Sequence, residues 1–400
     1  MNRASEQPQV VVAGHVCVDI IPDFGEAELP LEALLRPGHL TRVGPAVIST
    51  GGAVSNTGLA LHRLGIPVRL MGKIGQDLFG EAILAVFRSH SPTLADGMLV
   101  SPEEASSYTL VINPPGVDRI FIHCPGANDT FGAADIPLEE VRPARIFHFG
   151  YPTLMQRMHL DGGSELVQLM ASVKAAGVVT SLDMSQPDPA SSAGRADWEA
   201  ILTRTLPHVD IFAPNLDETL YMLDRPRYLE LTAAGSTHLP DGELLHAVAD
   251  RLLGMGAAIV ALKLGDRGLY LRTSADSRRL ATLTGLLPAD LTGWAGREMY
   301  TPCFRVKVAG TTGAGDCAYA GLLAGLLYGQ SIEAVLLSAA ASGACSVERA
   351  DATSGVPHWD VMQARLRSGW PHYPLSLPLT GWRSNAEETI WYGPGDHRAA

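Results

Sequence analysis

The distribution of apolar residues predicts an alternation of strands and helices in the first part of the chain. Runs rich in β-branched residues predict strands over 9–21 and 67–75. Apolar residues at helical spacing predict a helix over 56–65, which closes on Gly65, and another over 77–90. Strands and helices that alternate with short connections indicate parallel strands with helices packed on the faces of the sheet.

The pattern changes over 106–129, where residue types alternate on both sides of the sequence NPPG. Proline and glycine together in such a stretch favour a reversal of the chain, so we expect a β-hairpin there. A hairpin inserted into an α/β chain often forms a small sheet over a cleft. This segment is therefore a candidate lid.

From residue 144 onward the α/β pattern returns. Further strands are expected at 144–150, 178–185, 210–215, 257–265, 269–273 and 303–310. Further helices are expected at 163–177, 198–209, 216–223, 243–256, 316–328 and 331–348. No internal repeat or long linker interrupts the pattern, so one domain with a lid is expected.

Two segments lie outside this alternation. Residues 274–302 are irregular, and we interpret them as an excursion between paired strands. Residues 371–400 are rich in proline and carry late aromatic residues, which indicates an appended arm or a partly ordered tail.

Composition narrows the class of protein. With 46% hydrophobic residues in a chain of 400, a sizeable core can be buried. The net charge of −12 and the scattered basic residues argue against a nucleic-acid partner. The five cysteines include no C-x-x-C pair, which is typical of free thiols in a reducing compartment.

The chain also lacks the usual signals for export or membrane insertion. Its apolar start contains Asp19 and has no small-residue cleavage pattern. No stretch approaches the ~20 apolar residues that span a bilayer. We therefore expect a soluble cytoplasmic protein with no membrane partner.

The stretch KVAGTTGAGDCAYAGLLAGLL, residues 307–327, carries the strongest candidate chemistry. A glycine-rich loop at a helix start leaves backbone N–H groups uncovered, and an anion placed there meets them together with the positive end of the helix dipole. Asp316 directly follows Gly313, Ala314 and Gly315. It is suited to act as a general base for an attacking hydroxyl, while the loop stabilises a phosphoryl group in transfer.

Two other interpretations of Asp316 stay open at this point. Aspartate is a preferred helix N-cap, so the residue alone is compatible with a purely structural role. The sequence GAGDCA also fits the dinucleotide pattern G-x-G-x-x-A. That pattern belongs at the start of a βαβ unit, whereas two apolar helices follow it here, which argues against a dehydrogenase.

Polar residues near the first strand and helix form a second group of candidates. Gly51 and Gly52 let a ligand approach the backbone, and Asn56 has donors and acceptors for hydroxyl groups. Asp19 lies near the end of the first predicted strand, where ligands of parallel sheets bind and where a carboxylate suits sugar hydroxyls. A plain glycine turn, an Asn cap and a strand-end Asp are the alternatives.

A third group follows later strands. Asn215 and Glu218 are oxygen ligands three residues apart and suit Mg²⁺ or its waters, although an ordinary helix cap with an acidic first turn fits equally. Gly265 and Gly268 in LKLGDRG are placed to border a nucleotide, although a hairpin turn fits as well. The thirteen histidines form no H-E-x-x-H motif or Cys/His cluster, so zinc is not indicated. There is no G-x-S-x-G, so a serine hydrolase is not supported.

The order and spacing of these motifs resemble the PfkB/ribokinase family of carbohydrate kinases from about residue 9 to about residue 358. GGAVSNTGLALHRLG (51–65) looks like the N-terminal signature of the family. TTGAGDCAYAGLLAGL (311–326) looks like its C-terminal signature, which is quite specific.

The resemblance implies an α/β fold, namely a ribokinase-like three-layer α/β/α domain over 1–370 with a central, mostly parallel sheet. It implies a small β lid built from about 20–50 and 100–125, followed by a C-terminal extension over 371–400. It also implies ATP and Mg²⁺ as cofactors and transfer of the γ-phosphoryl group to a hydroxyl of a sugar or sugar acid. A homodimer formed through the lid is a further hypothesis.

By position, Asp316 matches the catalytic base of the family, and the 313–315 loop matches its anion hole. The other matched positions are the substrate-binding residues Asp19, Gly51, Gly52, Asn56 and, on the lid, Arg119; the nucleotide-site residues Lys263, Gly265, Gly268 and Gly343; and Asn215 and Glu218, which are tied to Mg²⁺ through water.

Two positions depart from the family pattern. Gly310 stands where the family usually has an aspartate that helps to hold a monovalent cation, which leaves activation by potassium open. Ala53 stands where ribokinases proper have a lysine after the double glycine, which makes ribose a less favoured substrate. A nucleoside kinase of the same fold and a non-catalytic ligand-binding relative are the alternative functions.

Overall fold

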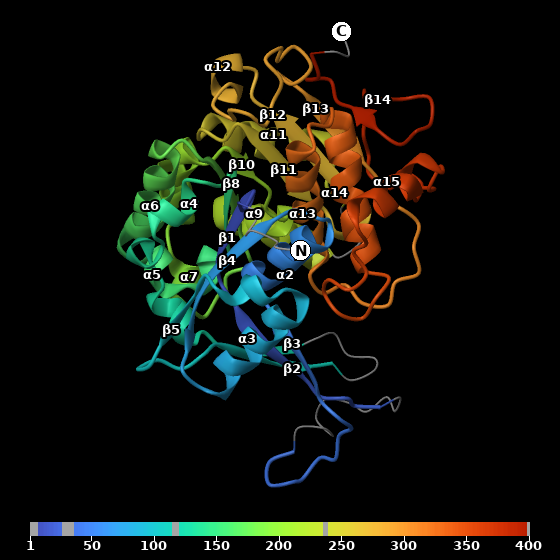
Figure 1. The fold of residues 1–400 in the computed structure, drawn as a ribbon. Helices are drawn as coiled ribbons and strands as arrows, with labels where there is room; N and C mark the ends of the chain where they lie inside the picture. Colours follow the sequence, from blue (N-terminus) through green and yellow to red (C-terminus); the bar gives the residue numbers. More distant parts are fainter. Residues whose placement is uncertain (1–6, 26–35, 114–119, 235–238, 398–400) are drawn as a thin grey trace, which may run out of the picture.

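The computed structural model describes residues 7–25, 36–113, 120–234 and 239–397. Within these ranges the chain forms one large sheet with helices on both faces and a second, smaller sheet at one end (Figure 1). The predicted three-layer α/β/α architecture is confirmed.

The large sheet contains eleven strands of the described chain. In spatial order they are β14 (Arg383–Ser384), β15 (Trp391–Tyr392), β13 (Glu298–Thr301), β12 (Leu269–Thr273), β11 (Ile259–Lys263), β10 (Ile211–Phe212), β9 (Val179–Asp183), β8 (Ile146–Gly150), β1 (Val10–Gly14), β4 (Val68–Gly75) and β5 (Met98–Ser101). The strands from β11 to β5 run parallel to one another, and the strands from β12 to β14 are antiparallel additions at one edge. The carboxyl ends of the parallel strands therefore meet along one edge, where ligands of such sheets bind.

Helices cover both faces because alternate residues of the central strands point to opposite sides. In β1, Val10 and Val12 enter one hydrophobic core, and Val11 and Ala13 enter the other. The first core is covered by α2 (Ala53–Arg63), α3 (Leu78–His90), α13 (Ala314–Leu327), α14 (Ile332–Ser346) and α15 (Trp359–Arg367). The second is covered by α6 (Ser164–Ala175), α8 (Trp198–Thr205), α9 (Leu216–Leu223) and α11 (Gly242–Gly254).

Further helices join these elements. They are α4 (Leu138–Val141), α5 (Gln156–His159), α7 (Ser192–Arg195), α10 (Arg225–Ala234) and α12 (Ser277–Leu280). No helix in the described ranges combines the length and the apolar character needed to cross a membrane.

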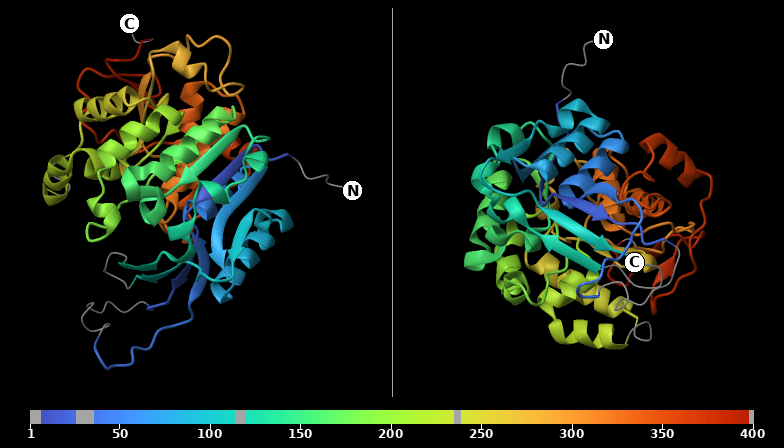
Figure 2. Two further views of the ribbon diagram at one scale, coloured as in Figure 1. Left: turned by 90° about the vertical axis from the view of Figure 1, so that its left-hand side faces the viewer. Right: turned by 90° about the horizontal axis from the view of Figure 1, so that it is seen from below.

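The small sheet contains β3 (Val47–Gly51), β2 (Cys17–Ile21), β6 (Tyr108–Ile112) and β7 (Ile120–Cys124), in that order. It extends away from the main sheet in Figure 1 and in the left view of Figure 2. The predicted hairpin is the antiparallel pair of β6 and β7. These four strands are hereafter called the lid.

The single strand predicted over 9–21 is wrong, because the chain forms two strands that belong to different sheets. β1 lies in the main sheet, whereas β2 begins three residues later in the lid. The break falls after Gly14, whose φ of 126° suits glycine and whose α-carbon lies against Gly150 of the neighbouring strand. A Cβ on Gly14 would lie 2.3 Å from the Gly150 carbonyl oxygen, so the departure from the sheet requires glycine.

The strand predicted over 303–310 is also wrong. Only Phe304 forms a bridge, with His372, and the rest of the segment has no regular strand. Its backbone bonds run instead to the chain after α15, since Arg305 N donates to the Pro371 carbonyl at 2.8 Å. The apolar alternation therefore reflects packing against the C-terminal segment.

The two segments outside the alternation both join the edge of the main sheet. Residues 274–302 leave β12 and return as β13, which pairs with β12 and lies inside the segment that is expected to be irregular throughout. The C-terminal segment adds β15 beside β13 and buries Leu377, Trp382 and Ile390. In the described range up to residue 397, the late aromatic residues therefore extend the sheet and its cores.

Candidate active site

Asp316 lies in the first turn of α13, beside helix α2 (Figure 1). Its side chain is only 3% exposed. The carboxylate accepts hydrogen bonds from Asn56 Nδ2 at 3.0 Å and from Thr57 Oγ1 at 3.3 Å, both on α2. Gly313 holds the N-cap position of α13 with no side-chain cap, so the purely structural cap interpretation of Asp316 is wrong.

Tyr151 is a third partner of Asp316, and sequence reasoning misses it. Its hydroxyl lies 2.8 Å from Oδ1 and 2.7 Å from Oδ2 of the carboxylate. Burial and the neighbouring Asp316 raise the pKa of Tyr151 well above its usual value, so the phenol stays protonated and donates. In the sequence, its position directly after the predicted strand that forms β8 is what could have marked it as a site residue, since ligands bind at the carboxyl edge of such sheets.

The backbone of Tyr151 is strained. Its φ of 66° and ψ of 46° lie in the left-handed region, which is uncommon for residues other than glycine. Such a conformation persists when the surroundings hold it in place, and it concentrates at functional sites. Here it turns the ring toward α13 and Asp316.

Lys263, at the end of β11, lies between Asp183 and the anion-hole loop. Its Nζ donates to both carboxylate oxygens of the fully buried Asp183, at 2.7 and 2.9 Å. A Cβ on Gly315 would lie 3.5 Å from the same Nζ. The lysine that the motif assigns to the nucleotide site therefore stands directly beside the residues 313–315.

Lys263 and the carboxylates around it shift one another's pKa values. Burial disfavours the ammonium, but Asp183, Glu218 and Asp316 outweigh it and raise the pKa of Lys263. Burial also raises the pKa of Asp183 to about 6, against the attraction of the lysine. Sequence reasoning misses Asp183, whose signal is again its position as the last residue of a parallel strand.

Asn215 and Glu218 begin α9, and they do cap this helix. Asn215 Oδ1 accepts a bond from Asp217 N at 3.0 Å, and Asn215 N donates to Glu218 Oε2 at 2.9 Å. Burial is the main cause that raises the pKa of Glu218, to about 8. Lys263 acts against this shift, and the negative charge of Asp183 adds to it. The interpretation of Asn215 and Glu218 as a helix cap is thus confirmed. The carboxyl group of Glu218 also lies near Asp183, Lys263 and Asp316.

A cavity of about 290 Å³ opens between α9 and the turn after β11. Asn215, Gly265 and Arg267 are among its lining residues. Gly265 has a φ of 62° and no atom within 4 Å of the position of a Cβ, so its backbone is open to a ligand. Gly268, with a φ of 120°, instead packs against the carbonyl of Thr301, where a Cβ would lie at 2.1 Å.

Gly343 and Gly310 both bring α14 or the chain after it close to the loop that precedes α13. A Cβ on Gly343 would lie 3.2 Å from the Ala314 carbonyl oxygen. A Cβ on Gly310 would lie 2.8 Å from the Ala350 carbonyl oxygen. The backbone of Ala350 therefore occupies the space that an aspartate at position 310 would need.

The lid carries a row of polar residues across its four strands. The register places Ser49, Asp19, Thr109 and His123 side by side. Thr109 Oγ1 lies 3.0 Å from His123 Nδ1, and burial raises the pKa of Asp19. A Cβ on Gly51 would lie 2.4 Å from Asp19 Oδ2, so this glycine makes room for the carboxylate.

His15 lies between the polar row and Tyr151, the partner of Asp316. His15 Nε2 lies 3.3 Å from His123 Nε2, and the rings of His15 and Tyr151 are 6.2 Å apart. Burial lowers the pKa of His15 to about 3, so the ring is neutral at physiological pH. Gly52 (φ 85°) lies against His15, since a Cβ there would be 2.5 Å from Nδ1.

Asn56 and Asp316 are thus in direct contact, and Asp19 lies in the polar row of the lid. The Oδ1 of the buried Asn56 has no hydrogen-bond partner in the described part of the chain, which suits a ligand hydroxyl. Arg119 lies outside the described residues. Within those residues, no three His, Cys, Asp or Glu side chains form a group that would hold a metal ion by itself.

The comparisons with known proteins agree with this geometry. Residues 7–359 match the model of the pfkB family carbohydrate kinases. An uncharacterized sugar kinase of Archaeoglobus fulgidus is 26% identical over 75% of this chain and 98% of its own length. Fructokinase-2 of Zea mays is 25% identical over 85% of this chain and 89% of its own.

Solved structures share the fold. A putative ribokinase II from E. coli, in complex with ATP and Mg²⁺, superposes with a TM-score of 0.64 at 20% identity. The match covers 90% of this chain and 99% of that protein.

Proposed function

The chain belongs to the pfkB family of carbohydrate kinases, and from this premise we propose that it transfers the γ-phosphoryl group of ATP to a hydroxyl of a sugar or sugar acid. Enzymes of this family are phosphotransferases with an alcohol group as acceptor. The observation that carries the proposal is the buried carboxylate of Asp316, which three donors hold at the start of α13, next to Lys263.

In the proposed reaction, the oxygen of the substrate hydroxyl forms a bond to the γ-phosphorus, and the bond from that phosphorus to the bridging oxygen of ADP breaks. The hydroxyl proton passes to the carboxylate of Asp316. Bonds from Asn56, Thr57 and Tyr151 fix the direction of the carboxylate before the substrate binds, which lowers the cost of reaching the reactive geometry.

The transferring phosphoryl group is proposed to lie at residues 313–315. The amides in the first turn of an α-helix have no partner within the helix, and in α13 the amide of Ala314 makes only a long bond of 3.4 Å to the Thr311 carbonyl, so this turn suits an anion. Lys263 adds a positive charge on the other side of Gly315. Such fixed donors stabilise developing charge without reorganising during the reaction.

Mg²⁺ fits the oxygen donors of Asn215 and Glu218, through water, and when bound it neutralises phosphate charge. Glu218 Oε2 is held by the backbone of Asn215, which fixes the direction of the carboxylate. The raised pKa of Glu218 indicates a group that a nearby cation would stabilise in its ionised form. The lid row supports a polyhydroxylated substrate, because carboxylate, hydroxyl and imidazole groups side by side match several sugar hydroxyls.

A turnover assay tests the proposal. Consumption of ATP would be measured over a panel of sugars, sugar acids and nucleosides for the wild type and for Asp316→Asn. We expect turnover on a sugar or sugar acid and a loss of roughly 10²–10⁴-fold in kcat for the variant, with ATP affinity retained. Full activity in Asp316→Asn would refute the base, and ATP binding without turnover on any substrate would favour a non-catalytic relative.

A homodimer through the lid is a second part of the proposal. Val47, Ile48 and Ile122 are apolar residues of lid strands that are 58%, 59% and 52% exposed. Sedimentation velocity would compare the wild type with Ile48→Asp and with Val361→Asp, a control at a 60% exposed position of α15. We expect Ile48→Asp alone to give monomers, and a monomeric wild type would contradict the dimer.

A further inference from the structure

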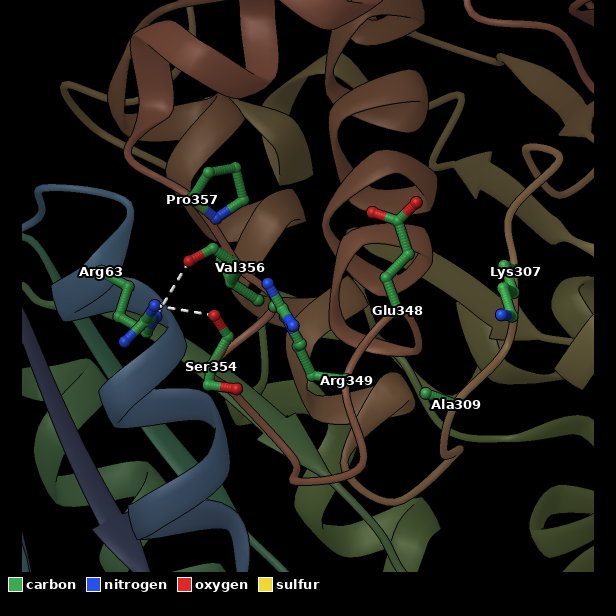
Figure 3. A pocket seen from close by; sticks show the side chains of 9 residues that line it. Arg63, Lys307, Ala309, Glu348, Arg349, Ser354, Val356 and Pro357 are labelled. Carbon is green, nitrogen blue, oxygen red and sulfur yellow. Dashed lines mark hydrogen bonds between the residues drawn. The ribbon is translucent and has the colours of Figure 1, made fainter.

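A second cavity, of about 600 Å³, lies on the outer side of the loop that follows α14. It is enclosed by the C-terminal end of α2, by residues 307–309 and by the chain over 348–357 (Figure 3). None of its lining residues belongs to the proposed catalytic, substrate or nucleotide positions. Its size falls within the roughly 300–1,000 Å³ range of small-molecule sites.

Three cationic side chains line this cavity: Arg63, Lys307 and Arg349. None of them has a carboxylate partner within ion-pair distance among the residues that the structure describes. In a chain with a net charge of −12, this concentration of unmatched positive charge stands out. It creates a local field that attracts anions.

The carboxylates near the cavity are already engaged. Glu348, which lines it, accepts bonds at 2.7 and 2.9 Å from Arg365, outside the lining. Asp351 accepts the backbone amides of Thr353 and Ser354. Both carboxylates are thus engaged, and Asp351 still attracts Arg63. Lys307 and Arg349 are therefore the two cations of the cavity without a carboxylate partner among the described residues.

Arg63 is also fixed in place. Its Nε donates to the Val356 carbonyl at 2.9 Å, and its Nη2 donates to the Ser354 carbonyl at 2.8 Å (Figure 3). In the same view Arg349 projects toward this guanidinium, and Lys307 stands on the opposite wall with Glu348 between them. One rigid and two adjustable cations around a cavity are suited to a ligand that carries more than one anionic group.

Both walls of the cavity touch the loop that precedes α13. Ala309 N donates to the Val347 carbonyl at 2.7 Å, and the backbone of Gly310 packs on Ala350. Gly313 packs on Ala352, to which its Cβ would lie at 2.6 Å. A ligand that fixes the two walls therefore restricts the loop that carries residues 313–315.

We propose that this cavity is an effector site for a small molecule with two or more phosphoryl groups, coupled to the nucleotide site through the 309–313 loop. The site goes beyond the proposed kinase activity. Binding at this cavity is measured without turnover. Failure of the effector site can therefore be told apart from failure of the proposed kinase activity.

Calorimetric titration with inorganic pyrophosphate tests the site. The experiment uses the full chain at low salt without Mg²⁺, both free and saturated with a non-hydrolysable ATP analogue. We expect one pyrophosphate site to persist in the saturated protein. The double variant Lys307→Gln, Arg349→Gln should bind pyrophosphate at least about tenfold more weakly, since charge-assisted contacts to phosphate are the strong ones.

The control is Arg88→Gln, Arg367→Gln, which removes the same charge at two exposed positions outside the cavity. It should bind like the wild type, and both double variants should keep the wild-type melting temperature. Absence of binding, complete displacement by the ATP analogue, or an equal loss in the control would overturn the site.

The coupling has its own readout. Affinity for the ATP analogue should change at least about threefold when pyrophosphate is present, and the effect should vanish in Lys307→Gln, Arg349→Gln, because linkage between two sites is reciprocal. An unchanged affinity would overturn the effector role.

Discussion

The proposed catalytic centre and the lid hold their polar side chains in different ways. In the centre, Asp183 and Asp316 are buried and Lys263 is half-buried, and each has a defined partner from another element. In the lid, most of the polar row is half-buried, on strands that also carry exposed apolar residues such as Ile48 and Ile122.

This difference separates two kinds of effect. A buried charge that loses its partner is costly to the fold as well as to the chemistry. A polar group on a half-exposed strand is replaced by water at little cost, so its loss falls mainly on the affinity for the ligand. Changes at the centre should therefore act on stability and kcat, and changes in the lid on the KM for the sugar.

The largest effect is expected for Lys263→Met. The variant leaves the fully buried Asp183 without its cation, so we expect a loss of about 3–5 kcal/mol in the free energy of unfolding. Chemical denaturation measures it. The double variant Lys263→Met, Asp183→Asn removes both charges and should recover most of the stability, and equal stability of wild type and single variant would contradict the buried pair.

Tyr151→Phe should act on the chemical step. Removing the hydroxyl takes away one donor, whose single hydrogen lies within reach of both oxygens of Asp316, and the loss of one hydrogen bond to a charged group corresponds to roughly a 10–100-fold fall in kcat. Steady-state kinetics should show the KM for the sugar within about twofold of the wild type, since the change acts on a transition-state interaction. A raised KM at constant kcat would place Tyr151 in substrate binding instead.

The dependence on Mg²⁺ should vary with pH. Since the pKa of Glu218 is raised to about 8, a proton competes with the cation below that pH, and the apparent affinity for Mg²⁺ should rise up to about tenfold per pH unit between pH 6 and 8. Magnesium titrations of activity at several pH values measure this slope. Glu218→Gln should flatten it, and an unchanged slope in that variant would exclude Glu218 from the metal site.

Glu218 should also make the stability of the Mg²⁺-free protein depend on pH. Glu218 keeps its proton to higher pH in the folded state than in the unfolded state. Its contribution is therefore complete below the unfolded pKa and lost as pH rises through about 8. Thermal unfolding should show the decline in the wild type and a weaker one in Glu218→Gln.

The smallest effect is expected in the lid. His123→Phe removes the contacts with Thr109 and His15 but keeps a ring of similar shape. We expect a rise of roughly three- to tenfold in the KM for the sugar, as for the loss of one hydrogen bond, with kcat nearly unchanged. Ile122→Val, on the same strand, is the control, and a fall in kcat for His123→Phe would remove the distinction between lid and centre.

Sequence reasoning finds those parts of the site that lie in short, contiguous motifs. The turn at Gly313, the first-turn Asp316 and the Asn215–Glu218 cap all follow from residues within a few positions of one another. Local backbone geometry determines such features, because glycine supplies the unusual φ and the helix start supplies free amides.

Sequence reasoning fails where the outcome depends on which sheet a strand enters. The run over 9–21 reads as one strand, but Gly14 packs on Gly150, and the chain passes from the main sheet to the lid. Residues 303–310 alternate like a strand, yet Arg305 bonds to Pro371 after α15 and Ala309 bonds to Val347 after α14. Both results depend on contacts with residues far away along the chain.

The amino-acid sequence by itself determined the α/β alternation, the glycine loop before α13 and the placement of Asp316 in its first turn, because these rest on local periodicity and turn chemistry. Only the tertiary structure decided that Tyr151, Asp183 and Lys263 surround that turn, since each stands at the end of a different strand. Parallel strands place their carboxyl ends along one edge whatever the sequence distance between them. The chemistry of the site therefore rests on neighbours that the folded sheet brings together.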